Sequence, residues 1–276
     1  MTMRKRVCAL LLALVCIAGC QSVQTTQPGA VGVNRKQLML VSEEDVEKGA
    51  QLAYRQELDK ARQQGGLNAD QQLYHRVQKI TQRIIPQTAA FRPDAPQWHW
   101  EVNVQTSKEV NAYCMPGGKV MVYTGLIEQL NASDAEIATV LGHEIAHALR
   151  EHSRERLSRA YAEQLALAGL AVATGAGDNT MALAQQVSAV TFTLPHSREQ
   201  EAEADRIGLE LMARAAYDPN AAVTLWQKMS KLGSGGGPPE FLSTHPSDEA
   251  RIRDLQALVP RVMPLYQAAV RQSGGK

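Results

Sequence analysis

Two histidines and a glutamate stand at a spacing that suits a divalent metal ion. The segment His143-Glu144-Ile145-Ala146-His147 places two imidazoles four residues apart. On a helix, residues four apart lie on one face about one turn from each other, so two neutral imidazole nitrogens can share one cation. The acid between them can act as a general base on water. The pattern therefore predicts a metal-dependent hydrolase.

A third ligand is needed, because a catalytic zinc takes three protein ligands and leaves one position to water. Glu151 stands four residues after His147, but ligands at i, i+4 and i+8 span about 12 Å of straight helix. His152 lies about 140° around such a helix from His147 and should point elsewhere. Arg150 and Ser153 occupy the places that the metzincin pattern gives to Gly and His. The third ligand must therefore come from another element.

The helix that carries the motif has its own start signal. Ser133-Asp134-Ala135-Glu136 has the form of a capping box, so we expect a helix that begins at Asp134 and runs well past His147. A second helix is expected over 199–215, where several carboxylates gather. The carboxylates of this second helix are candidates for the missing ligand.

The remaining elements predict an α+β fold that is mainly helical. Amphipathic spacing predicts helices over 43–62 and 70–85. The alternating segment 98–104 is typical of a strand, and the runs 110–115 and 119–123 around Pro-Gly-Gly predict a hairpin. We expect this small sheet and hairpin to border the helix of the metal motif.

Size and charge narrow the class of protein. A chain of 276 residues, 44% of them apolar, can bury one substantial core. There are 29 Lys and Arg against 28 Asp and Glu, without a basic block, which argues against nucleic-acid binding. The apolar run over 162–174 is too short for a membrane span and suggests core packing.

The N-terminus has the layout of a bacterial export signal. A basic start precedes an apolar run over 7–18 that is too short to remain as a membrane helix. Ile17-Ala18-Gly19-Cys20 resembles the lipobox, whose cysteine is diacylated; the alternative is an ordinary cleaved signal. We predict a lipoprotein signal peptide over 1–19, a lipid on Cys20, a flexible tether over 20–37 and a single catalytic domain over 38–276. Only Cys114 then remains as a thiol, so no internal disulfide is expected.

A second motif, over residues 197–205, gives the chain a family resemblance. His143-Glu144-x-x-His147, together with Ser197-Arg198-x-x-Glu201-x-x-Ala204-Asp205, resembles the HtpX-like family of zinc peptidases, which includes the CAAX prenyl proteases. The likeness is strongest to its periplasmic lipoprotein members, such as LoiP and BepA, without the helical-repeat domain of BepA. It implies a zincin-type domain with one Zn²⁺ per chain, held by His143, His147 and Glu201. Asp205, one turn from Glu201, would accept a hydrogen bond from a ligand histidine.

Other carboxylates and histidines receive no role. Glu203 lies about 200° around the helix from Glu201 and is expected to be solvated, as is Glu199. The histidines without a predicted role are His75, His99, His152 and His196.

Two further stretches match the family. The segment from Asn111 to Leu126 resembles the hairpin that borders its cleft. Asn111, Ala112 and Tyr113 would bind an extended peptide through the main chain; the alternative is a purely structural hairpin. Thr244-His245-Pro246 resembles the late motif whose histidine approaches the metal. His245 would stabilise the oxyanion or hold the fourth zinc position, unless it is simply a satisfied buried histidine.

These observations together predict a zinc metalloendopeptidase of the bacterial cell envelope. Glu144 would serve as general base towards a zinc-activated water. The resemblance implies that its substrates are misfolded or stalled envelope and outer-membrane proteins, with assembly machinery as a candidate partner. The lipid on Cys20 would hold it on the periplasmic side of a membrane, and Gln21 favours the outer membrane. The alternative is a chaperone-like assembly factor whose zinc is structural or autoinhibited.

Overall fold

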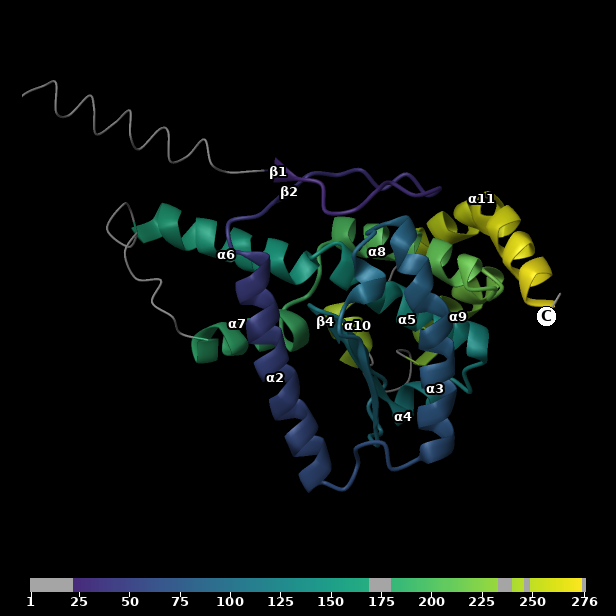
Figure 1. The fold of residues 1–276 in the computed structure, drawn as a ribbon, viewed down its shortest axis with the longest axis horizontal. Coiled ribbons are helices and arrows are strands. Elements are labelled where there is room, and N and C mark those ends of the chain that lie inside the picture. Colours follow the sequence, from purple (N-terminus) through teal and green to yellow (C-terminus); the bar gives the residue numbers. More distant parts are fainter. Residues whose placement is uncertain (1–21, 169–179, 233–239, 246–248, 275–276) are drawn as a thin grey trace, which may run out of the picture.

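The computed structural model describes residues 22–168, 180–232, 240–245 and 249–274 (Figure 1). The predicted signal peptide and Cys20 lie outside the described residues, as do Pro246 and the end of the apolar run predicted over 162–174. The fold is α+β and mainly helical, as predicted. No helix in the described part of the chain has both the length and the apolar character needed to cross a membrane.

Helices account for most of the chain, and several begin and end close to their predicted bounds. In chain order the helices are α2 (Glu43–Gln63), α3 (Gln71–Ile84), η1 (Ile85–Ala90), η2 (Ala95–Gln97), α4 (Thr124–Gln129), α5 (Asp134–Leu149), α6 (His152–Ala168), α7 (Thr180–Phe192), α8 (Arg198–Arg214), α9 (Asn220–Leu232), α10 (Glu240–Thr244) and α11 (Glu249–Gly274). The predicted capping box is confirmed, because Ser133 and Glu136 each bond the backbone N–H of the other at the start of α5.

The central sheet has three strands in the order β3-β5-β4. The predicted hairpin joins β4 (Ala112–Met115) to β5 (Lys119–Tyr123), with Gly117 and Gly118 at φ 75° and 78° in the turn. The predicted strand near residue 100 is β3 (Glu101–Gln105), which pairs with β5 in parallel. This order leaves β4 at the edge of the sheet.

The two faces of the sheet pack against different helices. Val104, Val120 and Val122 point into the main core with residues of α3, α5 and α8. Tyr113 and Met121 point the other way, into a second apolar cluster with residues of α2, α6 and α7. Figure 1 shows α2 and α3 on opposite sides of the sheet. The alternation of side chains along each strand thus divides the molecule into layers.

Helices α5 and α8 cross at a pair of glycines. A Cβ atom added to Gly208 would lie 2.7 Å from the backbone nitrogen of His143, and one added to Gly142 would lie 2.8 Å from the carbonyl oxygen of Gly208. The absence of both side chains lets the two backbones touch. This close approach brings the acidic first half of α8 against the histidines of α5.

The N-terminal segment differs from the predicted flexible tether over 20–37. In the structure, β1 (Ser22–Val23) pairs with β2 (Gln37–Leu38), and Val31 and Val33 are buried in the main core. Gln37 donates to the Arg150 carbonyl at 2.6 Å. Composition alone indicated a solvated segment, but two valines and a few polar side chains with buried partners hold residues 22–37 on the domain.

Helix α5 is shorter than predicted. It ends at Leu149, two residues past His147, and Glu151 adopts a left-handed conformation at φ 52° before α6 begins at His152. The expectation of a helix running well past His147 is therefore wrong. The left-handed turn at Glu151 also determines where His152 lies.

Candidate metal centre

Four buried side chains from three parts of the chain point at one another. His143 and His147 lie one turn apart on α5, Glu201 lies in the first turn of α8, and His245 directly follows α10. Each has 5% or less of its surface exposed. One donor atom from each of the four lies within 4.8 Å of all the others.

The distances within this cluster suit a metal ion. The Nε2 atoms of His143 and His147 are 3.1 Å apart. The Glu201 carboxylate oxygens lie 3.5 Å from His143 Nε2 and 3.3 Å from His147 Nε2. Two donors on one tetrahedral zinc with bonds of about 2.0–2.1 Å are about 3.4 Å apart. The donor set and its spacing therefore fit zinc.

Asp205 holds His143 from behind, as the resemblance implied for a ligand histidine. Its Oδ1 is 3.0 Å from His143 Nδ1, which leaves Nε2 facing the cluster. Arg251 bonds Asp205 at 2.7 Å and Glu201 at 2.7 Å. Burial alone would raise the pKa of Asp205, but the Arg251 guanidinium outweighs it and lowers that pKa.

Glu144 lies beside the cluster, and one of its carboxylate oxygens makes no hydrogen bond to the described residues. The side chain is 3% exposed, and its Oε1 has no hydrogen-bond partner among the described residues. The backbone N–H of Cys114 on β4 donates to the carboxylate. Burial raises the pKa of Glu144, partly offset by His245 and His143. A buried carboxylate of raised pKa next to a metal position is suited to accept and return a proton.

His245 lies within reach of both the cluster and Glu144. Its Nδ1 is 3.0 Å from Glu201 Oε1, and its Nε2 is 3.5 Å from Glu144 Oε1. Burial disfavours the imidazolium, but Glu201 and Glu144 outweigh it and raise the pKa of His245. The side chain is thus one of the four groups of the cluster and has partners suited to either predicted role.

A cleft of about 440 Å³ opens onto these groups. The three predicted substrate-binding residues line it, together with Glu144, His147 and His245. The Tyr123 N–H donates to the Asn111 carbonyl, so by alternation Ala112 and Cys114 turn their main-chain groups towards the open edge of β4. The residues of β4 are buried, and the Ala112 N–H donates to Asn111 Oδ1 at 2.9 Å and the Cys114 N–H to Glu144, so this edge offers a peptide the carbonyl groups of these two residues.

His152 and Glu203 are two neighbours that the sequence reasoning missed. His152 Nδ1 is 2.8 Å from His147 Nδ1, and His152 Nε2 is 3.0 Å from Glu203. The wheel projection assumed a straight helix, whereas the left-handed turn at Glu151 returns His152 to His147. No glycine or proline marks this turn, so no local signal reveals it.

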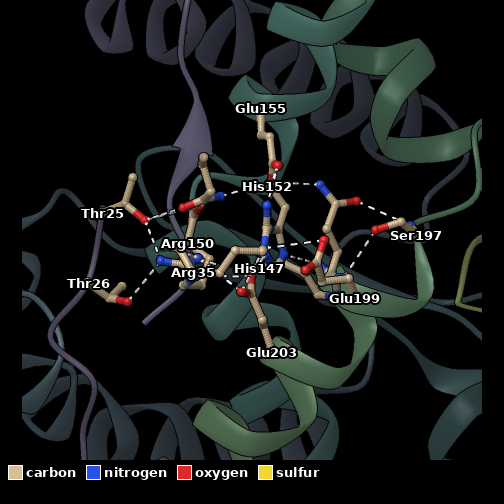
Figure 2. A network of polar contacts seen from close by, with 12 residues as sticks. Thr25, Thr26, Arg35, His147, Arg150, His152, Glu155, Ser197, Glu199 and Glu203 are labelled. Carbon is tan, nitrogen blue, oxygen red and sulfur yellow. Dashed lines mark hydrogen bonds and ion pairs between the residues drawn. The ribbon is translucent and has the colours of Figure 1, made fainter. Parts of the chain in front are cut away.

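Glu203 is buried rather than solvated, which corrects the prediction. It is 6% exposed and bonds Arg150, Arg35 and His152 (Figure 2). Burial opposes its charge, but these partners lower the pKa of Glu203 to about 2. Glu199 is solvated as predicted, with its side chain 60% exposed.

The other histidines without a predicted role divide into two groups. His75 and His99 are exposed on the surface. His196 lines the cleft, with its ring centroid 4.1 Å from that of His147. No sequence pattern places His196 in the site, because it precedes α8 and no spacing rule connects it with α5.

The comparison with known families gives a match over most of the domain. The model of peptidase family M48 matches residues 71–259, which include the α5 histidines and the α8 carboxylates. The chain belongs to peptidase family M48. The predicted metallopeptidase family is thereby confirmed at this level, while the finer likeness to HtpX-like and LoiP-like members stays a prediction.

Curated relatives of this M48 chain come from mitochondria and from bacteria. It is 43% identical over 159 residues to mitochondrial metalloendopeptidase OMA1 of Arabidopsis thaliana, which covers 56% of this chain and 31% of the relative. It is 36% identical over 190 residues to the Schizosaccharomyces pombe OMA1, and this match covers 68% of this chain and 54% of the relative. It is 31% identical over 169 residues to the beta-barrel assembly-enhancing protease of Escherichia coli, and this match covers 57% of this chain and 34% of the relative. The matches span about a third to a half of these relatives.

Proposed function

We propose that this M48 chain is a zinc-dependent endopeptidase in which His143, His147 and Glu201 hold the metal. The observation that supports this most directly is the convergence of their donor atoms, from two separate helices, at separations of 3.1–3.5 Å. The names of the relatives, metalloendopeptidase and protease, favour the same activity. A bound zinc supplies a Lewis acid that makes water more acidic and polarises a carbonyl group.

Glu144 would act as the general base in this reaction. Its Oε1 has no hydrogen-bond partner among the described residues and lies 3.5 Å from His245 Nε2 of the cluster. Burial raises the pKa of Glu144 towards the range in which a carboxylate can take a proton from water and later give it to the leaving amine. Glu144 lies on the same helix turn as the two histidines and lines the cleft, where a scissile bond would lie.

The edge of β4 would bind the substrate as an extended strand. Main-chain hydrogen bonds to the outward-facing carbonyl groups of Ala112 and Cys114 would hold a peptide of almost any sequence next to Glu144. This mode of binding suits unfolded segments, because a folded protein rarely offers a free strand. It supports misfolded or unassembled proteins as the substrate class.

The cellular setting follows from the N-terminal pattern and one group of relatives. The export signal and Cys20 favour a lipid-anchored protein on the periplasmic side of a bacterial membrane, and Gln21 favours the outer membrane. The similarity to a bacterial beta-barrel assembly-enhancing protease supports an envelope role, with assembly machinery as a partner. Incorporation of labelled fatty acid into wild type, and its loss in Cys20→Ala, would test the anchor.

A variant of the proposed base gives the decisive test. Glu144→Gln removes the proton acceptor while keeping the size of the side chain, so zinc content should stay at one per chain and cleavage of unfolded casein should fall by about 10²–10⁴-fold. Glu163→Gln, an exposed change on α6, is the control. Equal cleavage by Glu144→Gln and wild type would contradict the proposal. Casein binding without cleavage by the zinc-loaded wild type would favour the chaperone-like alternative.

A further inference from the structure

The two histidines of α5 are held by different kinds of partner. Each turns Nε2 towards the metal position, as the 3.1 Å separation of these atoms indicates. Behind them, His143 Nδ1 meets a carboxylate, Asp205, at 3.0 Å, whereas His147 Nδ1 meets a second imidazole, His152, at 2.8 Å. The second arrangement requires a defined tautomer, because one of two facing nitrogens must donate and the other accept.

The partner of His152 decides which nitrogen donates. Its Nε2 lies 3.0 Å from the Glu203 carboxylate, which can only accept, so Nε2 carries the proton of a neutral His152. His152 Nδ1 is then a bare acceptor, and His147 Nδ1 must be the donor. That tautomer leaves the His147 Nε2 lone pair free for a metal, which is what a ligand imidazole needs.

Glu203 is itself fixed from two sides. Arg150, fully buried, donates to it from Nε and Nη2 at 3.1–3.2 Å, and Arg35 donates from the N-terminal segment at 2.8 and 3.0 Å (Figure 2). Arg150 also donates to Thr25 and Thr26. The carboxylate is therefore charged and immobile, and it can hold the His152 ring in one orientation.

The short distance argues against a second metal at this place. His147, His152 and His196 also bring donor atoms together. The Nδ1 atoms of His147 and His152 are 2.8 Å apart, a hydrogen-bond distance and well below the roughly 3.4 Å expected for two nitrogens on one tetrahedral zinc.

We propose that His152, oriented by Glu203, is the positioning residue for His147, fixing its tautomer and ring plane for metal binding. This inference depends on the proposed zinc site. It assigns a use to two buried side chains, 0% and 6% exposed, that the hydrolytic mechanism does not otherwise employ. Partners of this kind behind a ligand histidine contribute about 10–100-fold to metal affinity.

Zinc affinity, measured by competition with a chromophoric chelator, tests the proposal. His152→Leu removes both hydrogen bonds and should weaken zinc binding about 10–100-fold. His152→Asn can still accept from His147 near the place of Nδ1 and should lose less. His75→Leu, a change of an exposed histidine, should bind zinc as wild type does. Val77→Ala, which opens a cavity in the buried face of α3, controls for general loss of stability.

Ring-nitrogen NMR of the zinc-loaded wild type needs no substitution and keeps the test valid if His152→Leu fails to fold. The expected signature is His147 with a protonated Nδ1 and a metal-bound Nε2. An unprotonated His147 Nδ1, or unchanged zinc affinity in a folded His152→Leu, would overturn the inference while leaving the zinc site intact. Two zinc ions per wild-type chain, one of them lost in His152→Leu, would also overturn it. Absence of zinc binding by wild type would instead remove the proposed function and the inference with it.

Discussion

Glu144 and Glu201 are both buried glutamates beside the same two histidines, yet their carboxyl groups differ in pKa. Burial raises the pKa of both. For Glu144 this effect prevails, because the nearby imidazoles of His245 and His143 offset it only in part. For Glu201, His245, His147 and His143 outweigh burial and bring its pKa well below the ordinary value. At the scale of single residues, neighbours thus suit one carboxylate to proton transfer and the other to holding a cation.

His245 is the residue whose substitution separates its two predicted roles. If it occupies the fourth metal position, His245→Ala should weaken zinc binding and raise basal cleavage of casein, because a blocking donor has been removed. If it stabilises the oxyanion, zinc affinity should stay and cleavage should fall by about 10²–10³-fold. Chelator competition and casein cleavage on the same preparation distinguish the two. Unchanged values in both measurements would show that His245 is only a buried structural histidine.

Arg251 neutralises the two carboxylates that face the metal position from α8. Its guanidinium bonds Glu201 and Asp205 at 2.7 Å and lies 3.9 Å from the Trp226 ring centroid. Arg251→Met should reduce the free energy of unfolding by about 3–5 kcal/mol, because it leaves buried carboxylates without their cation. Urea denaturation of the zinc-free protein measures this. Arg253→Met is the matched control, since that side chain is 67% exposed.

At the scale of elements, the crossing of α5 and α8 sets how far apart the ligands from the two helices lie. Glu201 and Asp205 reach His143 and His147 only because the backbones of α5 and α8 touch, at a point where each helix has a glycine. Helix packing usually keeps axes about 8–10 Å apart, according to the side chains between them. Here the missing side chains decide the spacing of the site.

Gly208→Ala tests this dependence. The new methyl group would meet the α5 backbone at 2.7 Å, which no side-chain rotation can relieve, so we expect a loss of about 1–3 kcal/mol in stability and weaker zinc binding. Thermal unfolding and chelator competition would measure the two effects. Gly66→Ala is the control, because a Cβ at Gly66 meets only ordinary contacts at 3.4 Å or more. Wild-type zinc affinity in Gly208→Ala would show that the close crossing of α5 and α8 does not set the spacing of the ligands.

At the scale of the whole molecule, buried charges join the N-terminal segment to the catalytic layers. Arg35 bonds both Glu155 on α6 and Glu203 on α8, and Gln37 bonds Glu155 as well. Figure 2 shows Arg35, Glu155 and Glu203 gathered between the segment and the two helices. Residues far apart in the sequence are thus held by one polar network, in which Arg35, Glu155 and Glu203 are charged at neutral pH.

The pH dependence of stability should reveal this network. Burial opposes ionisation of Glu155, but Arg35, Gln37 and Gln200 outweigh it and lower its pKa far below the value of about 4.3 expected in the unfolded chain. The stabilisation is therefore complete above about pH 5 and is lost as the pH falls towards the pKa of the folded state. Glu155→Gln should lower stability at pH 7 by about 2 kcal/mol and flatten the decline between pH 5 and 2. Urea unfolding of the zinc-free protein at several pH values would measure both effects, with Glu163→Gln as control. If the stability of Glu155→Gln and of wild type fell in parallel with pH, the prediction would be wrong.

The sequence by itself determined the features that depend on neighbours a few residues away. The capping box begins α5, the four-residue step puts His143 and His147 on one face, and Pro-Gly-Gly closes the hairpin. Each of these follows from local backbone geometry and hydrogen bonding, so each could be predicted without knowing the rest of the fold. Glu201 and Asp205 came from a motif resemblance instead, and the structure places both beside His143.

Only the tertiary structure decided which distant groups meet. The parallel pairing of β3 with β5, the burial of Glu203, the packing of residues 22–37 and the return of His152 to His147 all depend on contacts between separate elements. A helical wheel assigns a direction to a side chain but cannot show what another helix places there. The solvated or buried state of a charged residue is set by that second surface, and for this reason the network behind His147 could not be predicted from its sequence.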